Sequence, residues 1–179
     1  MSNAEEGHKR RQSMYDWQTS FEWGTQQEHL VLKQLADLYP QWSVKPTGGL
    51  NEPDGEFVYG GIEIKSYSTW YFKPPIETGI VGGKPSCWVT DERVTLLIVN
   101  HDEWLHLYRA DKLRACMDSI PQYQSNVSQG NGDYKRMNFL YVSPMSTRQD
   151  HKCDTQYDPE RWNLSGLDES PYICSIKKV

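Results

Sequence analysis

The apolar residues between positions 30 and 38 recur at helical spacing. They form one stripe along a helix and are Leu30, Val31, Leu32, Leu35 and Leu38. Ahead of this stripe, Thr19-Ser20-Phe21-Glu22 has the form of a capping box, in which a hydroxyl and a glutamate three residues later satisfy free backbone N–H groups. Pro40 cannot continue a helix because it lacks an N–H group. The pattern therefore predicts a helix from Phe21 to about Tyr39.

Several shorter apolar segments predict the strands of one sheet. Residues 42–45 form a short strand-like piece, and two further strands joined at Gly60-Gly61 make a hairpin. Residues 94–99 are a continuous β-branched and aliphatic run, which is typical of a central strand buried on both faces. The remaining predicted elements are a strand at 104–108, a helix at 110–117 and a late strand at 139–142. This order predicts an α+β or mixed α/β domain built around one sheet.

Polar segments divide the chain into an arm and one domain. Residues 1–18 are polar and charged, and we treat them as an N-terminal arm. Residues 66–90 are rich in glycine and proline and residues 119–137 are rich in Gln, Asn, Ser and Gly, so both segments predict long loops. The length of 179 residues fits a single domain, here residues 19–179, that is large enough to bury a core.

Composition and charge exclude several classes of partner. Lys plus Arg number 19 against 24 Asp plus Glu, so any contact with nucleic acid has to be local. No apolar run approaches the roughly 20 residues that span a bilayer, and residues 1–12 lack the apolar core of a signal peptide. We therefore expect a cytoplasmic protein with no membrane partner. The four cysteines are widely scattered, which predicts free thiols and no zinc ribbon.

Three charged residues of the predicted hairpin converge on one side of it. Side chains alternate between the faces of a strand, so Glu63 and Lys65 project together while Ile62 and Ile64 project toward the core. On the preceding strand, apolar packing leaves Asp54 on the polar side. Two carboxylates at the end of a hairpin are hard oxygen ligands suited to Mg²⁺ or Mn²⁺. The adjacent lysine can orient a water molecule and offset charge that develops on a phosphate.

These residues also resemble the signature of a known family. Pro53-Asp54, eight intervening residues and then Glu63-Ile64-Lys65 are similar to the motif of the PD-(D/E)XK nuclease superfamily. The resemblance implies an α/β (α+β) fold with a restriction-endonuclease-like core, in which helices flank a mixed central β-sheet in the order αβββαβ. It also implies that Asp54 and Glu63 hold a metal ion together with the Ile64 carbonyl, and that Lys65 activates the attacking water.

Many members of this superfamily carry a further glutamate on the first helix. Glu22 belongs to the capping box, where its ordinary role is to cap the helix. Glu28 precedes Val31, Leu32 and Leu35 by three, four and seven residues, which places it on or beside the apolar stripe that faces the sheet. A carboxylate there needs a partner, because burial of an unpaired charge is costly. We therefore expect Glu28 to be an additional metal ligand or a water-positioning group.

The resemblance implies a Mg²⁺- or Mn²⁺-dependent endonuclease that hydrolyses phosphodiester bonds, with DNA preferred to RNA as substrate. Many endonucleases that cut both strands are symmetric dimers, which makes a homodimer the candidate assembly. Trp70 and Tyr71 are candidates for stacking on bases, and Lys73 and Lys84 are candidates for contacting phosphates. Packing in the core or within the loop is the alternative role of these residues.

Two other functions stay open on the sequence alone. Asp-Gly is an ordinary turn and Glu-x-Lys is an ordinary solvated strand face, so the short motif also occurs without a catalytic role. In that case the chain is a catalytically inactive nuclease-fold protein that acts as a nucleic-acid or protein binding module. A nuclease directed at unpaired RNA, with its aromatic residues stacked on bases, is the other alternative.

Overall fold

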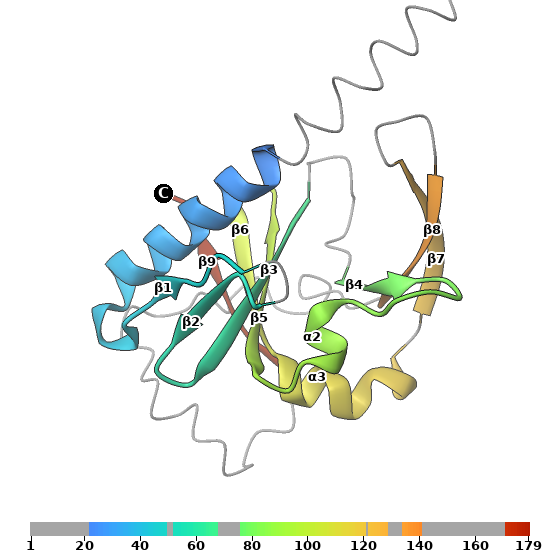
Figure 1. Cartoon of the computed structure of the whole chain (residues 1–179). Coiled ribbons are helices and arrows are strands. Elements are labelled where there is room, and N and C mark those ends of the chain that lie inside the picture. The colour runs from blue at the N-terminus through green and yellow to red at the C-terminus, as the bar shows by residue number, and fades with distance from the viewer. Residues whose placement is uncertain (1–21, 50–51, 68–75, 121, 129–133, 141–170) are drawn as a thin grey trace, which may run out of the picture.

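The computed structural model describes residues 22–49, 52–67, 76–120, 122–128, 134–140 and 171–179. These residues form an α+β fold with few helices, in which a mixed six-strand sheet stands beside a three-strand antiparallel sheet (Figure 1). The expected arm at residues 1–18 and the capping residues Thr19 and Ser20 lie outside the described residues.

The six-strand sheet combines antiparallel neighbours with one parallel pair. Its strands, in spatial order, are β1 (Lys45–Pro46), β2 (Gly55–Phe57), β3 (Gly60–Tyr67), β5 (Val94–His101), β6 (Trp104–Arg109) and β9 (Tyr172–Lys177). The parallel pair is β3 with β5. Because parallel neighbours need a long crossover connection, the chain leaves the sheet after β3 and returns at β5. The strand β4 (Ile76–Ile80) and the short helix α2 (Cys87–Thr90) lie within this crossover.

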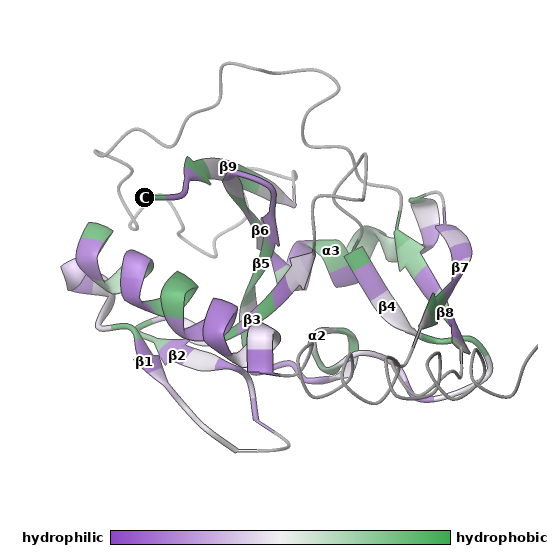
Figure 2. Cartoon of the chain, turned by 90° about the horizontal axis from the view of Figure 1, so that it is seen from above, coloured by the Kyte–Doolittle hydropathy of each residue, from purple (hydrophilic) through white to green (hydrophobic). Residues whose placement is uncertain are grey.

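The three-strand sheet lies to one side of the larger sheet (Figure 2). Its strands, in spatial order, are β4 (Ile76–Ile80), β8 (Tyr134–Leu140) and β7 (Gln122–Ser128). The helical elements are the first helix (22–38), η1 (Pro40–Trp42), α2 (Cys87–Thr90), α3 (Ala110–Cys116) and η2 (Met117–Ser119). Among the helices of the described ranges, none is long and apolar enough to cross a membrane.

Apolar side chains on the two faces of the larger sheet form two separate cores. On one face, Leu35 of the first helix shares a core with Ile64 of β3. On the other face, Trp88 of α2 and Leu113 of α3 share a core with alternate residues of β5. The β5 segment 96–99 is fully buried, which confirms the prediction of a central strand there. The larger sheet is therefore the middle layer of the fold.

The predicted first helix and the predicted helix at 110–117 are both confirmed. The first helix covers residues 22–38 within the described part of the chain, and α3 ends one residue before the predicted end. In the first helix, Leu30 and Leu38 of the apolar stripe remain 53% and 38% exposed. The part of the stripe that meets the sheet is narrower than the sequence pattern suggests.

The two predicted long loops are wrong over their described residues. The segment 66–90 contains the end of β3, all of β4 and α2, and the segment 119–137 contains β7 and the first half of β8. Both segments are polar or rich in glycine, so they lack the apolar alternation that identifies a strand. Pairing of β8 with a strand on each side stabilises the smaller sheet instead, and such long-range pairing leaves no local signal.

The β2–β3 hairpin is confirmed, but its turn lies earlier than predicted. The chain turns at Val58-Tyr59, and Gly60 and Gly61 form the start of β3. Gly60 has a φ of +136°, and a Cβ atom there would lie 2.6 Å from the Thr95 hydroxyl oxygen. The first of these glycines therefore allows the close approach of β5, which is a different task from making the turn.

The cysteines only partly match their predicted state. Cys87 and Cys116 are free thiols, as expected. Cys174 is in a disulfide bond, so the prediction of four free thiols is wrong for this residue. Spacing along the sequence detects local cysteine pairs, whereas a disulfide requires only that two Cα atoms be close in space.

Candidate active site

Asp54 is fixed at the edge of β3 because β2 is short. β2 pairs with only the first three residues of β3, Gly60–Ile62. Just beyond this pairing, Asp54 Oδ2 accepts a hydrogen bond of 2.7 Å from the backbone N–H of Ile64. The carboxylate thus occupies the place that a further strand residue would take, and it lies next to the strand that carries the other predicted site residues.

Glu63 and Lys65 lie on the face of β3 that points away from the first helix. Ile62 and Ile64 belong to the core beneath that helix, as the alternation of the strand predicts. The Lys65 ammonium Nζ and the Glu63 carboxylate Oε1 are 2.7 Å apart, and the two side chains are 24% and 6% exposed. The structure therefore brings Asp54, Glu63 and Lys65 together around one strand.

The carboxyl group of Asp54 carries the strongest electrostatic strain in this group. Burial and, after it, the nearby Glu63 carboxylate raise its pKa to about 7 from the ordinary 3.8. The hydrogen bond from Ile64 and the Lys65 ammonium act in the opposite direction but do not compensate. Two carboxylates thus share one cation, and the site favours binding of an additional positive charge or a proton.

Glu28 lies within electrostatic range of these residues, from the first helix. It is half-buried, and burial raises its pKa, while Lys65 lowers it and Glu63 raises it. Within the described residues, no hydrogen bond or ion pair joins Glu28 directly to Lys65 or to Glu63. The prediction that Glu28 lies beside the core stripe agrees with its burial, and its part in the chemistry stays a prediction.

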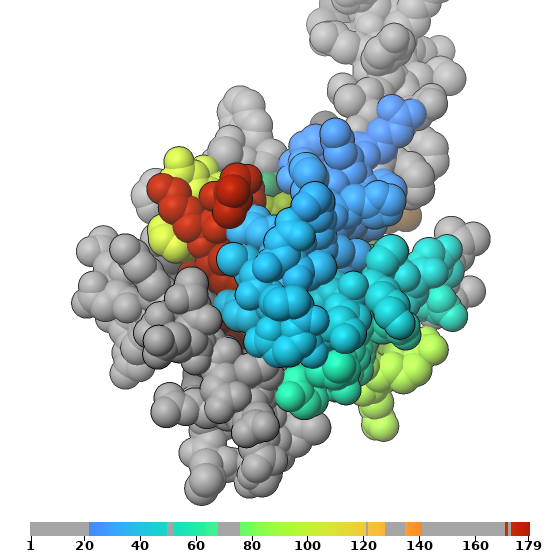
Figure 3. All heavy atoms as spheres, turned by 90° about the vertical axis from the view of Figure 1, so that its left-hand side faces the viewer, coloured from blue at the N-terminus to red at the C-terminus, as the bar shows by residue number. Residues whose placement is uncertain are grey.

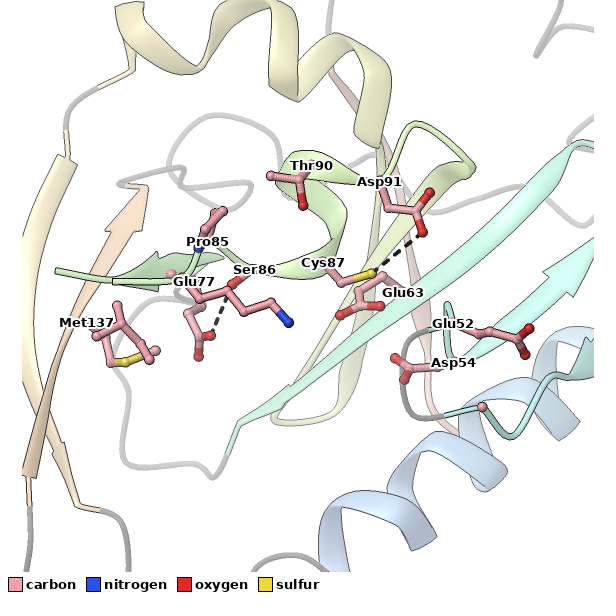
Figure 4. A pocket seen from close by; sticks show the side chains of 14 residues that line it. Glu52, Asp54, Glu63, Glu77, Pro85, Ser86, Cys87, Thr90, Asp91 and Met137 are labelled. Carbon is pink, nitrogen blue, oxygen red and sulfur yellow. Dashed lines mark hydrogen bonds between the residues drawn. The ribbon is translucent and has the colours of Figure 1, made fainter. Parts of the chain in front are cut away.

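An acidic cavity of about 520 Å³ opens between the two sheets at this point (Figure 4). Asp54 and Glu63 line it from the larger sheet, and β4 with the turn that follows it lines the opposite side. The charged residues of its wall are Glu52, Asp54, Glu63, Glu77, Lys84 and Asp91. The first helix and β1 to β3 form the neighbouring surface of the molecule (Figure 3). A cavity with this excess of carboxylates is suited to cations and, through them, to phosphate groups.

Glu77 is a site residue that the sequence reading missed. It lies on β4, inside the segment predicted to be a loop, and its Oε1 accepts a hydrogen bond of 3.1 Å from the Ser86 hydroxyl. The only sequence signal was weak, namely that the β-branched residues Ile76 and Thr78 flank it. Both residues are buried in the structure.

Cys87 contributes a thiol to the same cavity but is unsuited to nucleophilic chemistry. Burial raises the pKa of this thiol, and the carboxylates of Glu63 and Asp91 raise it further. Because the thiolate is the reactive form, the thiol at neutral pH is protonated and unreactive. Cysteine-based hydrolysis is therefore a poor fit to this cavity.

Of the four residues predicted to contact nucleic acid, one lies within the described part of the chain. Lys84 lines the cavity from the turn after β4 and is exposed, which is compatible with a phosphate contact. The other three candidates, Trp70, Tyr71 and Lys73, lie outside the described residues.

The donor groups at this site suit Mg²⁺ or Mn²⁺, although they are not preassembled. Across the described ranges, no three His, Cys, Asp or Glu side chains are gathered closely enough to hold a metal ion as they stand. The available donors are the carboxylates of Asp54 and Glu63 and the Ile64 carbonyl. The N–H and C=O groups of one strand residue point to the same side, so this carbonyl faces the side on which Asp54 lies. All three donors are oxygens, as these ions require.

Comparison with known proteins identifies no relative. No family model matches the chain, and the comparisons found no curated protein or solved structure similar to it.

Proposed function

We propose that the protein is a Mg²⁺- or Mn²⁺-dependent endonuclease of the PD-(D/E)XK superfamily that acts on DNA in preference to RNA. The observation that carries this proposal is the arrangement of Asp54 on the N–H of Ile64, directly beside the Glu63–Lys65 ion pair. Two carboxylates and one ammonium lie beside the carbonyl of one strand residue, and this arrangement supports the proposal.

The topology of the larger sheet supports the same family. The first helix precedes three strands joined in antiparallel order, β1 to β3, and α2 then leads to β5, which is parallel to β3. Apart from β4, which lies between β3 and α2 and pairs in the smaller sheet, this succession agrees with the αβββαβ order of a restriction-endonuclease-like core. The first helix also covers one face of the sheet, and α2 and α3 cover the other.

Each residue of the site has a distinct task in phosphodiester hydrolysis. Asp54 and Glu63, with the Ile64 carbonyl, would hold the metal ion, which supplies Lewis acidity and positive charge for the phosphate oxygens. Lys65 carries a positive charge and three donors, so it can orient the attacking water and stabilise negative charge that develops on the phosphate. Glu28, which is within electrostatic range of Lys65 and Glu63, would position the same water from the first helix.

A substrate panel tests the proposal. Plasmid, linear, branched and single-stranded DNA, and also RNA, are incubated with the protein in Mg²⁺, Mn²⁺ or EDTA. We expect metal-dependent cleavage that is fastest on DNA, lost in Asp54→Ala and kept in Glu56→Ala, because Glu56 is exposed on β2 and is not among the cavity carboxylates. Metal-independent binding without cleavage of any substrate would instead support a nuclease-fold binding module.

A further inference from the structure

The backbone of Glu77 is fixed by hydrogen bonds with residues of α2 and β3. The Trp88 indole N–H donates a hydrogen bond of 2.7 Å to the Glu77 carbonyl, and the Glu77 N–H donates one of 3.3 Å to the Tyr67 hydroxyl. Trp88 is fully buried, so the first contact is shielded from water. The backbone of this residue is therefore fixed between α2 and the end of β3.

The side chain of Glu77 is fixed separately by the turn that follows β4. Gly79 has a φ of +139°, and Pro85 approaches it so closely that a Cβ atom on Gly79 would lie 2.5 Å from the Pro85 Cα. This close approach lets the Ser86 N–H donate to the Thr78 carbonyl at 2.9 Å. Ser86, which is 8% exposed, then donates its hydroxyl proton to the Glu77 carboxylate. An ordered acceptor results on the β4 side of the cavity (Figure 4).

The position of Glu77 relates it to Lys65. Tyr67, which contacts the Glu77 backbone, lies two residues beyond Lys65 on the same face of β3. Glu77 therefore lies above the face of the strand from which Lys65 projects, whereas Glu63 approaches Lys65 along the strand itself. Within the described residues the Lys65 ammonium pairs with Glu63, and no ion pair joins it to Glu77. Burial lowers the pKa of Lys65, and Glu63 and then Glu77 raise it.

We propose that Glu77 is a positioning residue of the active site, a fixed carboxylate across the cavity that takes over the Lys65 ammonium when Glu63 turns to a metal ion. The inference deepens the proposed function and rests on it. In the proposed site, Glu63 would both pair with the Lys65 ammonium and bind the metal ion. A second carboxylate, oriented by Ser86, keeps Lys65 directed at the substrate when Glu63 is engaged elsewhere.

The test compares Glu77→Gln with Glu77→Asp, Ser86→Ala and the control Glu56→Gln, on the nucleic acid that the wild-type protein cuts fastest. Glutamine keeps the size of the side chain and an acceptor for Ser86 but removes the charge. We expect kcat of Glu77→Gln to fall about tenfold or more with KM within about twofold, because orientation of Lys65 matters in the transition state. Glu77→Asp should retain part of the activity, Ser86→Ala should show a smaller loss, and Glu56→Gln should show none.

A second readout separates positioning from metal binding. Titration with Mn²⁺, followed by the electron paramagnetic resonance signal of the free ion, should give the same affinity for Glu77→Gln and the wild-type protein, and a lost site for Asp54→Asn. Full kcat in a folded Glu77→Gln overturns the proposal, and so does a loss of Mn²⁺ affinity equal to that of Asp54→Asn, which would make Glu77 a ligand. If the wild-type protein neither binds Mn²⁺ nor cuts, the nuclease proposal itself is contradicted and the Glu77 proposal with it.

Discussion

The Asp54 carboxylate accepts the N–H of Ile64 at 2.7 Å and so continues the edge of β3 where β2 ends. The Oδ2 atom of Asp54 thus has a structural role, while the whole carboxyl group is buried near the Glu63 carboxylate. The same residue therefore connects the stability of the hairpin to the chemistry of the cavity, and variants that separate charge from hydrogen bonding can distinguish the two.

Replacement of Asp54 by asparagine should stabilise the metal-free protein at neutral pH. The pKa of Asp54 is about 7 in the folded protein against 3.8 ordinarily, so the folded state holds a proton that the unfolded state has lost between these values. The stability of the wild-type protein therefore falls as pH rises from about 4 to 7. Asp54→Asn keeps an acceptor for Ile64 and lacks this penalty, which amounts to at most about 4 kcal/mol.

Urea denaturation of wild type and Asp54→Asn in EDTA, at several pH values, measures this effect. The difference in free energy of unfolding should be small near pH 4 and should grow in favour of Asp54→Asn up to about pH 7, the pKa of Asp54. A difference that does not change with pH would contradict the account of Asp54 as a strained carboxylate.

Metal binding should depend on pH in the same range. A carboxylate must lose its proton before it binds Mg²⁺ or Mn²⁺, and Asp54 does so only near pH 7. The apparent Mn²⁺ affinity of the wild-type protein should rise about tenfold per pH unit below this value and level off above it. Isothermal titration calorimetry from pH 5.5 to 8.5 can follow the change, and an affinity that is constant over this range would show that Asp54 is not a ligand.

The buried histidine His106 should make the protein sensitive to acid. Burial lowers its pKa to about 4 from 6.5, with His101 adding to the effect, and its Nδ1 lies 2.7 Å from the Ser175 hydroxyl of β9. Between these values the unfolded state binds a proton that the folded state excludes. Stability should therefore fall by about 3 kcal/mol as pH drops from 6.5 to 4.

The matched comparison is His106→Gln against His29→Gln, since His29 is exposed on the first helix. Urea denaturation across the acidic range should show a flatter pH dependence for His106→Gln than for the wild-type protein, and no change for His29→Gln. Equal pH dependence in all three proteins would show that folding does not lower the pKa of His106.

Gly79→Ala should destabilise the β4 side of the cavity more than Gly82→Ala. Both glycines have positive φ, but a Cβ on Gly79 meets the Pro85 backbone at 2.5 Å, whereas a Cβ on Gly82 meets nothing within 4 Å. We expect Gly79→Ala to lose roughly 2–3 kcal/mol of unfolding free energy and Gly82→Ala about 1 kcal/mol. Thermal or urea denaturation checks the order, and equal losses would show that the turn after β4 adapts freely.

The parts of the fold that the sequence predicts are those with a strong local pattern. Leu35 and its neighbours identify the first helix, and the aliphatic run that begins at Val94 identifies β5, because both bury a regular apolar face. The smaller sheet has no such face. In β7 the residues are mostly polar, and the strand exists because β8 pairs with it over its whole length.

The candidate site is predictable to the same extent. The alternation of β3 correctly separates Glu63 from Ile64, since it depends only on the geometry of a strand. Glu77, on the other wall of the cavity, was missed because it belongs to β4, a strand without a sequence signal. The hydrogen bond from Ile64 to Asp54 was also beyond reach, because it depends on where β2 stops and hence on a turn at Val58-Tyr59 that the glycines do not mark.

If Asp54, Glu63 and Lys65 form a metal-dependent phosphodiesterase site, removal of the lysine should abolish cleavage. Lys65→Ala and the control Lys33→Ala, an exposed lysine of the first helix, are purified identically and assayed on DNA with Mg²⁺, Mn²⁺ or EDTA. We predict metal-dependent cleavage by the wild-type protein and Lys33→Ala, with a loss of about a hundredfold or more in a folded Lys65→Ala. Cleavage that is equal in all three proteins, or absent from the wild type in both metals, would show that these residues do not form such a site.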